Sequence, residues 1–262
     1  MLIAVTRAVS PTLAECELTH LPRDPINVAD AMAQHASYEA ALRSLGATVV
    51  RAPDEPKLPD AVFVEDTALV LDEVAVITRP GAPSRRPEIA SMAQVLSAYR
   101  SLRRIESPGT LDGGDVLVVG RTIYVGVSSR SNAEGIAQLE TLLAEWKYEV
   151  VPVQVTGCLH LKSAVTQVGD ELLLINPDWV RPECFPLLKK VTVARGEPNA
   201  ANALRIGSTV IYPAHQPQTA ERLARAGLGV FLVSCTELAK AEGGVTCCSV
   251  VFEAARERNP QN

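Results

Sequence analysis

Hydrophobic and polar positions follow one recurring pattern along much of the chain. A polar cluster precedes a short apolar strand, a tight turn and a second apolar strand, which together predict a β-hairpin. The predicted turns are LDEV at 71–74, VGRT at 119–122, VGDE at 168–171 and IGST at 206–209. These turns recur at intervals of about 40–50 residues, a period typical of repeat architectures.

Segments with helical periodicity lie between the hairpins. Residues 84–99, 131–146 and 218–227 each repeat apolar positions at helical spacing and begin near Ser, Thr or Pro. Residues 27–51 predict one more helix and strand, and a short apolar strand follows each of the other helices. The unit is therefore a hairpin, a helix and a further strand.

The two ends of the chain supply the last hairpin in this interpretation. LIAVTR at 2–7 and VTCCSVVF at 245–252 are both strand-like and would pair. Five strand–hairpin–helix units would then close into a ring, which removes the exposed sheet edges of an open array. We expect a single α/β domain over 1–262 whose last few residues are frayed. A two-domain α/β protein with coincidentally similar hairpins is the alternative.

Composition narrows the class of partner. The chain has 262 residues, with 25 basic and 30 acidic side chains and a net charge of −5. It therefore lacks the positive surface that nucleic acid or an anionic membrane requires. Charged residues interrupt every apolar run, and the first residues lack a basic leader. We expect a soluble, cytoplasmic protein.

The six cysteines form no CxxC motif and have no regular spacing. This pattern argues against a disulfide framework and against a zinc ribbon, so we expect free thiols. Cys248 is expected to be a small core residue. Cys247 is more informative because of the residues at equivalent positions in the other units.

Residues capable of chemistry lie just before the first strand of each predicted hairpin. They occur in PDAVFVED (59–66), TLDGGDV (110–116), CLHLKS (158–163), EPNAAN (197–202) and GGVTCC (243–248). In a ring these positions converge on one axis, which would place His160 beside Cys247. A thiolate is a competent nucleophile, an imidazole favours it, and Asp112 could orient that imidazole.

The surrounding charges indicate the ligand. Acidic residues around a cysteine suit a cation, and paired carboxylates match a planar guanidinium, so Glu65 and Asp66 could clamp one. Arg85 and Arg130 could hold a carboxylate and Asp60 an amine. The ligand that these groups describe is an arginine-like amino acid.

At these residues the sequence resembles the dimethylarginine dimethylaminohydrolase family of the guanidino-group-modifying enzyme superfamily. The motifs FVED, RPGAPSRR, TLDGGDV, HLKS, NAAN and VTCCS carry the resemblance, in order over nearly the whole chain. The resemblance implies a five-bladed α/β propeller of ββαβ units. It also implies a cofactor-independent hydrolase that converts Nω-methylated L-arginine to L-citrulline and an amine.

The resemblance also implies roles for individual residues. These roles are nucleophile for Cys247, general acid and base for His160, orienting carboxylate for Asp112, guanidinium ligands for Glu65 and Asp66, amino-acid binding for Asp60, Arg85 and Arg130, and backbone contacts near Leu18 and Ala241. Residues 14–24 would form a mobile lid. No metal is implied, although an inhibitory zinc at Cys247 is left open.

Two departures bear on the substrate. Deiminases and amidinotransferases typically carry an acidic residue two positions after the histidine, where this chain has Lys162. Asp112 stands where other members of the superfamily often have Glu. The alternatives are a hydrolase or deiminase acting on arginine or another N-substituted arginine, and a non-catalytic protein that binds arginine derivatives. The sequence leaves both a monomer and a homodimer open.

Overall fold

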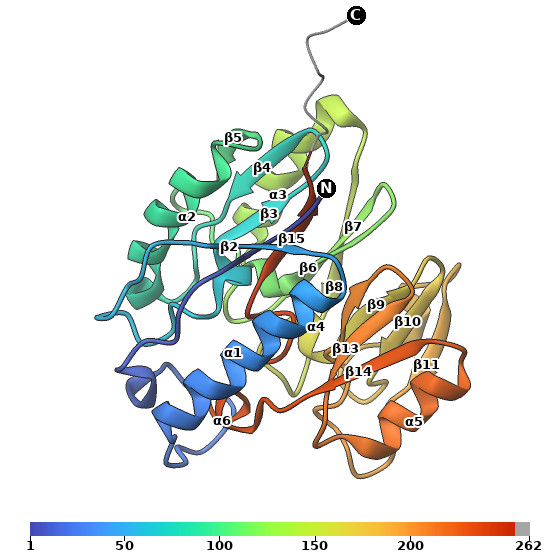
Figure 1. Ribbon diagram of the computed structural model, residues 1–262. Coiled ribbons are helices and arrows are strands. Elements are labelled where there is room, and N and C mark those ends of the chain that lie inside the picture. The colour runs from blue at the N-terminus through green and yellow to red at the C-terminus, as the bar shows by residue number, and fades with distance from the viewer. Residues whose placement is uncertain (255–262) are drawn as a thin grey trace, which may run out of the picture.

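Five three-stranded sheets make up the fold in the computed structural model, which describes residues 1–254 (Figure 1). In every sheet the central strand pairs antiparallel with one neighbour and parallel with the other. The antiparallel partner is the other strand of the hairpin. The parallel partner follows after a connection, and this connection contains an α-helix in four of the five sheets, which therefore have the predicted ββαβ order.

The strands, with the central one second in each sheet, are β15 (Val250–Glu253), β1 (Leu2–Thr6) and β2 (Thr48–Arg51); β3 (Ala68–Val70), β4 (Val74–Ile77) and β5 (Ser101–Arg104); β6 (Val116–Val119), β7 (Thr122–Val127) and β8 (Glu149–Gln154); β9 (Val165–Gly169), β10 (Leu172–Ile175) and β11 (Lys189–Thr192); β12 (Leu204–Ile206), β13 (Thr209–Pro213) and β14 (Gly229–Val233). The α-helices are α1 (Val28–Ser44), α2 (Ile89–Leu96), α3 (Ala133–Leu143), α4 (Leu161–Ala164), α5 (Pro217–Arg225) and α6 (Thr236–Ala239). The 3-10 helices are η1 (Leu13–Glu15), η2 (Val64–Thr67), η3 (Pro83–Glu88), η4 (Gly113–Asp115), η5 (Ala144–Trp146) and η6 (Pro182–Cys184).

Strands from near both ends of the chain form one sheet. β1 pairs antiparallel with β15, with Leu2 opposite Glu253 and Val5 opposite Val250. The first strands of neighbouring sheets also contact each other, as in β15 with β3, β6 with β9, and β9 with β12. The sheets therefore have the arrangement of the predicted five-bladed propeller, and the similar hairpins are repeats of one architecture.

The hydrophobic core is divided among the contacts between neighbouring sheets. One buried cluster joins β1 to β4, and others join β4 to β7, β7 to β10, and β10 to β13. The fifth cluster joins β13 to β1 and includes residues of α1. Since each sheet buries both faces against its neighbours, the clusters follow one another around the ring.

Local sequence explains the helices and turns. Asn27 accepts hydrogen bonds from the N–H groups of Ala29 and Asp30 in the first turn of α1, and Asn132 accepts one from the N–H of Gly135 in the first turn of α3. Gly120 and Gly207 lie in hairpin turns with φ of +60° and +61°, a conformation that favours glycine.

One predicted unit lacks its helix. The connection from β10 to β11 contains the short η6 and no α-helix. Three prolines, at 177, 182 and 186, interrupt this segment, and each removes a backbone donor that an α-helix would use. The expectation of five strand–hairpin–helix units is wrong at this unit. The frayed tail that we predicted lies outside the described residues.

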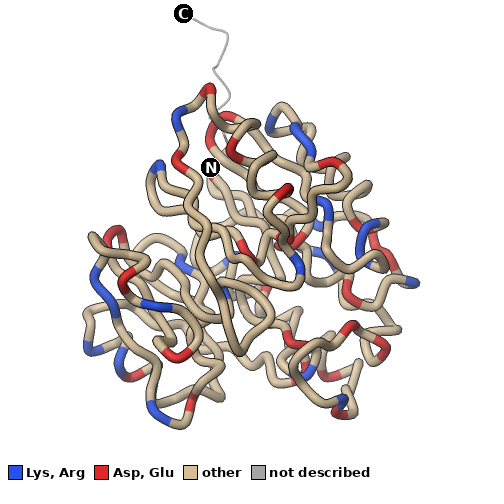
Figure 2. The backbone as a smooth tube through the Cα atoms, turned by 180° about the vertical axis from the view of Figure 1, so that it is seen from behind, with Lys and Arg blue, Asp and Glu red and all other residues tan. Residues whose placement is uncertain are grey.

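Two further observations concern the distribution of charge and the possibility of a membrane-spanning helix. Basic and acidic residues are interspersed along the chain, and several of both signs lie near the middle of the molecule (Figure 2). Among the helices within residues 1–254, none is both long enough and apolar enough to cross a membrane.

Candidate active site

The chemically capable residues lie immediately before the first strands of their sheets. Asp66 is in η2 before β3, and Asp112 directly precedes η4 and β6. His160 precedes α4, which leads into β9, and Cys247 lies in the turn before β15. Asp66, His160 and Cys247 line one cavity, where His160 also contacts Asp112. The repeat thus brings together residues that are far apart in the sequence.

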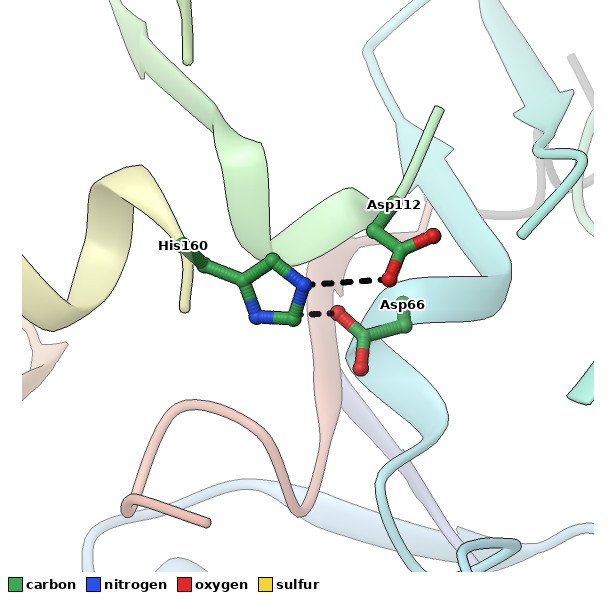
Figure 3. A group of neighbouring side chains, drawn as sticks. All are labelled: Asp66, Asp112 and His160. Carbon is green, nitrogen blue, oxygen red and sulfur yellow. Dashed lines mark hydrogen bonds and ion pairs between the residues drawn. The ribbon is translucent and has the colours of Figure 1, made fainter. Parts of the chain in front are cut away.

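His160 points toward two buried carboxylates, those of Asp112 and Asp66, which lie on the same side of its ring (Figure 3). Its Nε2 is 3.0 Å from Oδ2 of Asp112, and its Nδ1 is 3.9 Å from Oδ1 of Asp66. Burial by itself lowers the pKa of His160, but the charge of Asp66 and the hydrogen bond with Asp112 outweigh it and raise the pKa to about 9. The imidazole therefore carries a proton at neutral pH and can donate it.

The two glycines after Asp112 allow this close approach. A Cβ atom at Gly114 would lie 2.7 Å from Nδ1 of His160, and one at Gly113 would overlap the carbonyl oxygen of Glu65. The N–H of Gly114 also donates to Oδ1 of Asp66 at 2.9 Å. The DGGDV loop needs glycine here because it packs against the candidate acid and its carboxylates.

Cys247 is held from both sides of its turn. Its Sγ accepts the N–H of Gly244 at 3.3 Å, and its carbonyl accepts the N–H of Glu65 at 3.1 Å. Burial raises the pKa of the Cys247 thiol, and the charges of Glu65 and Asp66 raise it further. Our expectation that the imidazole would favour a thiolate is therefore wrong for the unliganded protein, because the nearby carboxylates and the burial dominate.

Cys248 is buried, with 2% of its surface exposed, and belongs to the core cluster between β13 and β1. That burial agrees with the prediction that Cys248 is a small core residue. Both cysteines lie in the turn before β15 and not in the strand, so strand alternation does not separate them.

Asp66 also binds Arg85 in a buried ion pair. Nη1 of Arg85 donates to Oδ2 of Asp66, while its Nε and Nη2 donate to Glu88 at 3.1 and 2.8 Å. Nη2 further contacts the carbonyl of Phe63 at 2.9 Å. Burial alone raises the pKa of Asp66, but the charges of His160 and Arg85 lower it to about 2. Arg85 thus lies against the cavity with most of its donors already engaged by the protein.

Glu65 is engaged by two partners and lies behind the cavity lining. Its Oε1 accepts a hydrogen bond from Nζ of Lys162 at 2.6 Å, and its Oε2 accepts one from the Thr246 hydroxyl at 2.8 Å. Asn202 donates to the same hydroxyl at 2.9 Å and to the carbonyl of Lys162 at 3.1 Å. The structure therefore places Glu65 beside Cys247 while its carboxylate is neutralised by Lys162.

The other predicted ligand-binding residues surround the same cavity to different degrees. Asp60, Arg130 and Ala241 line it, whereas Leu18 packs nearby against the core cluster between β13 and β1. Nη1 of Arg130 is 3.9 Å from Oδ2 of Asp112. The cavity measures only about 20 Å³, room for roughly one water molecule, so an amino acid enters only if part of the wall moves.

The predicted lid residues form part of that wall, and Glu242 holds them. Its carboxylate accepts the N–H groups of Thr19, His20 and Leu21 at 2.9, 2.5 and 2.6 Å. The Thr19 hydroxyl also accepts a hydrogen bond from Arg130 at 3.1 Å. Sequence reasoning missed Glu242, whose only signal was its place between Ala241 and the glycine pair. Its φ of +57°, rare for a non-glycine residue, is visible only in the structure.

One group of side chains is close enough to share a metal ion. Within residues 1–254, ligand atoms of Asp66, Asp112 and His160 lie within 4.8 Å of one another, and Cys247 is not part of this group. Asp66 already binds Arg85, and Asp112 accepts the N–H of Gly81 at 2.8 Å. These carboxylates are therefore engaged by protein donors, and zinc at Cys247 stays a prediction.

Comparison with known proteins identifies relatives over most of the chain. The family model described as "N,N dimethylarginine dimethylhydrolase, eukaryotic" matches residues 21–193. A Streptomyces coelicolor N(G),N(G)-dimethylarginine dimethylaminohydrolase is 41% identical over 94% of this chain and 95% of its own.

Solved structures share the fold. The Pseudomonas aeruginosa enzyme, as a cysteine-to-serine mutant complexed with citrulline, superimposes with a TM-score of 0.90 at 33% identity, over 95% of this chain and 98% of its own. The N-terminal domain of ArgZ, an arginine dihydrolase from cyanobacteria, superimposes with a TM-score of 0.87 at 19% identity, over 97% of this chain and 98% of its own. At that identity the second likeness concerns the fold alone.

Proposed function

Because the chain belongs to the dimethylarginine dimethylaminohydrolase family, we propose that it hydrolyses Nω-methylated L-arginine to L-citrulline and methylamine or dimethylamine. The observation that carries this proposal is one cavity lined by Cys247, His160 and Asp66. Carboxylates beside a cysteine suit a cationic substrate, and the net charge of −5 does not suit nucleic acid.

The substrate cation supplies the charge that the thiol lacks. In the free protein, burial, Glu65 and Asp66 keep Cys247 protonated. A guanidinium bound in the cavity beside Asp66 offsets this negative charge and lowers the pKa of the thiol. The thiol proton then leaves to solvent, and the thiolate forms next to the carbon that it attacks.

His160 completes the first half of the reaction. Attack of the Cys247 sulfur on the guanidinium carbon gives a tetrahedral adduct, which collapses when His160 donates its proton to the departing methylated nitrogen. A covalent S-alkylthiouronium group stays on Cys247. Asp112 keeps the imidazole oriented throughout, since its Oδ2 is 3.0 Å from Nε2.

The second half uses the same histidine as a base. The neutral His160 takes a proton from water, whose oxygen attacks the thiouronium carbon. The carbon–sulfur bond then breaks, citrulline leaves, and Cys247 is restored. In this scheme Arg130 and Arg85 lie at the end of the cavity that receives the substrate carboxylate, and Asp60 at the end that receives the amine.

Citrulline release by the purified protein from asymmetric dimethylarginine, monomethylarginine and arginine tests the proposal. We expect release from the methylated substrates and none from a Cys247→Ser variant. Turnover of arginine instead would assign the chain to a deiminase activity, and binding without turnover would make it a non-catalytic binding protein.

A further inference from the structure

A second cavity meets the first at Cys247. It measures about 240 Å³, against about 20 Å³ for the cavity that contains His160. The two cavities share Leu159, Glu242, Gly243 and Cys247. Cys247 therefore lines two cavities, and the proposed mechanism uses only the smaller one.

The two cavities differ in the charge of the side chains that line them. The first is lined by side chains of both signs, among them Asp60, Asp66, Arg85 and Arg130. The second, here called the neutral cavity, has apolar walls and uncharged polar groups, and Glu242 at the junction is its acidic member. The apolar walls are Trp179, Pro213, Cys235 and Ala239. His215 also lines it, and burial lowers the pKa of this imidazole, which keeps it neutral at pH 7.

The walls of the neutral cavity are fixed by packing and hydrogen bonds. Gly157 has φ +75°, and a Cβ atom there would lie 2.7 Å from the Trp179 ring, so this ring packs directly on the backbone. On the other side, Asn202 is held by Thr246 at 2.9 Å and by the carbonyl of Lys162 at 3.1 Å. The neutral cavity is therefore formed before any ligand arrives, which is typical of a binding site.

The chemistry of the substrate indicates what enters this cavity. A dialkylated guanidino nitrogen has no N–H to donate, so it gains nothing by facing the carboxylate of Asp66. If the unsubstituted nitrogen faces Asp66 and the carbon lies at Cys247, the substituted nitrogen stays beside His160, as the proton transfer requires, and its substituent extends past Leu159 and Gly243 into the neutral cavity. An apolar cavity of about 150 Å³ is enough to bind benzene, so this one has room for far more than two methyl groups.

We propose that the neutral cavity is a subsite for the substituent on the outer guanidino nitrogen, and that it accepts uncharged alkyl or aryl groups larger than methyl. This inference rests on the proposed function. For Nω-benzyl-L-arginine, the bond between the guanidino carbon and the benzyl-bearing nitrogen breaks. Water supplies the oxygen of the citrulline ureido group, and benzylamine leaves as the protonated amine.

The experiment compares kcat/KM for asymmetric dimethylarginine and Nω-benzyl-L-arginine in four proteins. The wild type is expected to hydrolyse both. Asn199→Phe narrows the cavity at an exposed position and should lower the value for the benzyl substrate about tenfold relative to dimethylarginine. Trp179→Ala removes an apolar wall of the neutral cavity and should also lower kcat/KM for the benzyl substrate relative to dimethylarginine. Trp146→Ala, which removes the other tryptophan outside the cavity, should leave the ratio unchanged.

The outcomes separate this inference from the proposed function. Hydrolysis of dimethylarginine without hydrolysis or competitive binding of the benzyl substrate would overturn the subsite and keep the function, as would a ratio that Asn199→Phe does not change. If no substrate is turned over, binding affinities measured by calorimetry still test whether the neutral cavity is a subsite. Weaker binding of Nω-benzyl-L-arginine to Asn199→Phe, with unchanged binding of arginine, would support the subsite, and equal binding would overturn it.

Discussion

Nε2 of His160 lies 3.0 Å from Oδ2 of Asp112, and both residues are buried. The carboxylate does more than orient the ring. It stabilises the protonated imidazole in surroundings that would otherwise remove the proton, and its own Oδ1 is held by the N–H of Gly81. The pair therefore sets the pH range in which His160 serves as a proton donor.

Replacing Asp112 by Asn should lower the pKa of His160 from about 9 toward its ordinary value of 6.5, because the hydrogen bond loses its charge. We expect a drop of about one unit, which corresponds to about 1.4 kcal/mol. An NMR titration of the imidazole measures it, with the exposed Asp178→Asn as control. The alkaline limb of the kcat profile should move to lower pH with it, and an unchanged titration would remove Asp112 from this role.

The Cys247 thiol should titrate well above its ordinary pKa in the free protein, because it is buried beside Glu65 and Asp66. Saturating L-arginine should lower the apparent pKa, whereas citrulline, which lacks the positive charge, should not. The ultraviolet absorbance of the thiolate measures both, with Cys247→Ser as the blank for the other cysteines. A thiolate already present at pH 7 without ligand would contradict the idea that the substrate cation generates it.

Glu242→Gln should loosen the lid, because three backbone N–H groups of residues 19–21 lose a charged acceptor. Hydrogen bonds to charged groups contribute about 1.5–3 kcal/mol, so opening should become about 10- to 100-fold more frequent. Hydrogen exchange of those three amides reports this directly. The matched control is Glu15→Gln, an exposed change nearby in η1. Equal protection in the two variants would show that packing, not Glu242, closes the lid.

Glu39 should contribute to stability mainly above acidic pH. Burial alone raises its pKa, but hydrogen bonds from Arg51 and Thr6 lower it to about 2, below the ordinary 4.5. A carboxyl whose pKa is depressed on folding stabilises the fold above its unfolded pKa and loses that contribution as the pH falls through its folded pKa. Glu39→Gln should therefore lower the free energy of unfolding by about 1–3 kcal/mol at pH 7.

Urea titrations of this variant at pH 7 and pH 3 measure the difference. The difference in the free energy of unfolding between variant and wild type should be smaller at pH 3. At that pH, Glu39 is mostly protonated in the unfolded wild type. A deficit of the same size at both values would mean that the side-chain shape matters and the charge does not.

Much of the architecture could be predicted because short local sequence patterns determine each repeat. The turns near Gly120 and Gly207, and the apolar strands on both sides of them, determine each hairpin independently of the rest of the chain. The segment between β10 and β11 departs from the regular repeat because its three prolines remove backbone donors that an α-helix would use.

The residues of the candidate site could be predicted from the sequence, but the contacts between them were harder to predict. Glu65 is neutralised by Lys162, whose Nζ lies 2.6 Å from Oε1 of Glu65. The two residues belong to different repeats, so no local sequence pattern predicts this pair. The same holds for Glu242 and the lid, whose contact joins residues more than two hundred positions apart. Local sequence indicates which side chains face the axis, and only tertiary packing selects their partners.

The pairing of β1 with β15 has a kinetic consequence. Ile3 and Phe252 meet across almost the whole chain, and contacts of such long sequence separation are slow to form during folding. Cys248 becomes shielded in the cluster between β13 and β1 only when that last sheet is assembled. Pulsed alkylation of Cys248 during refolding would therefore report the rate at which the ring closes.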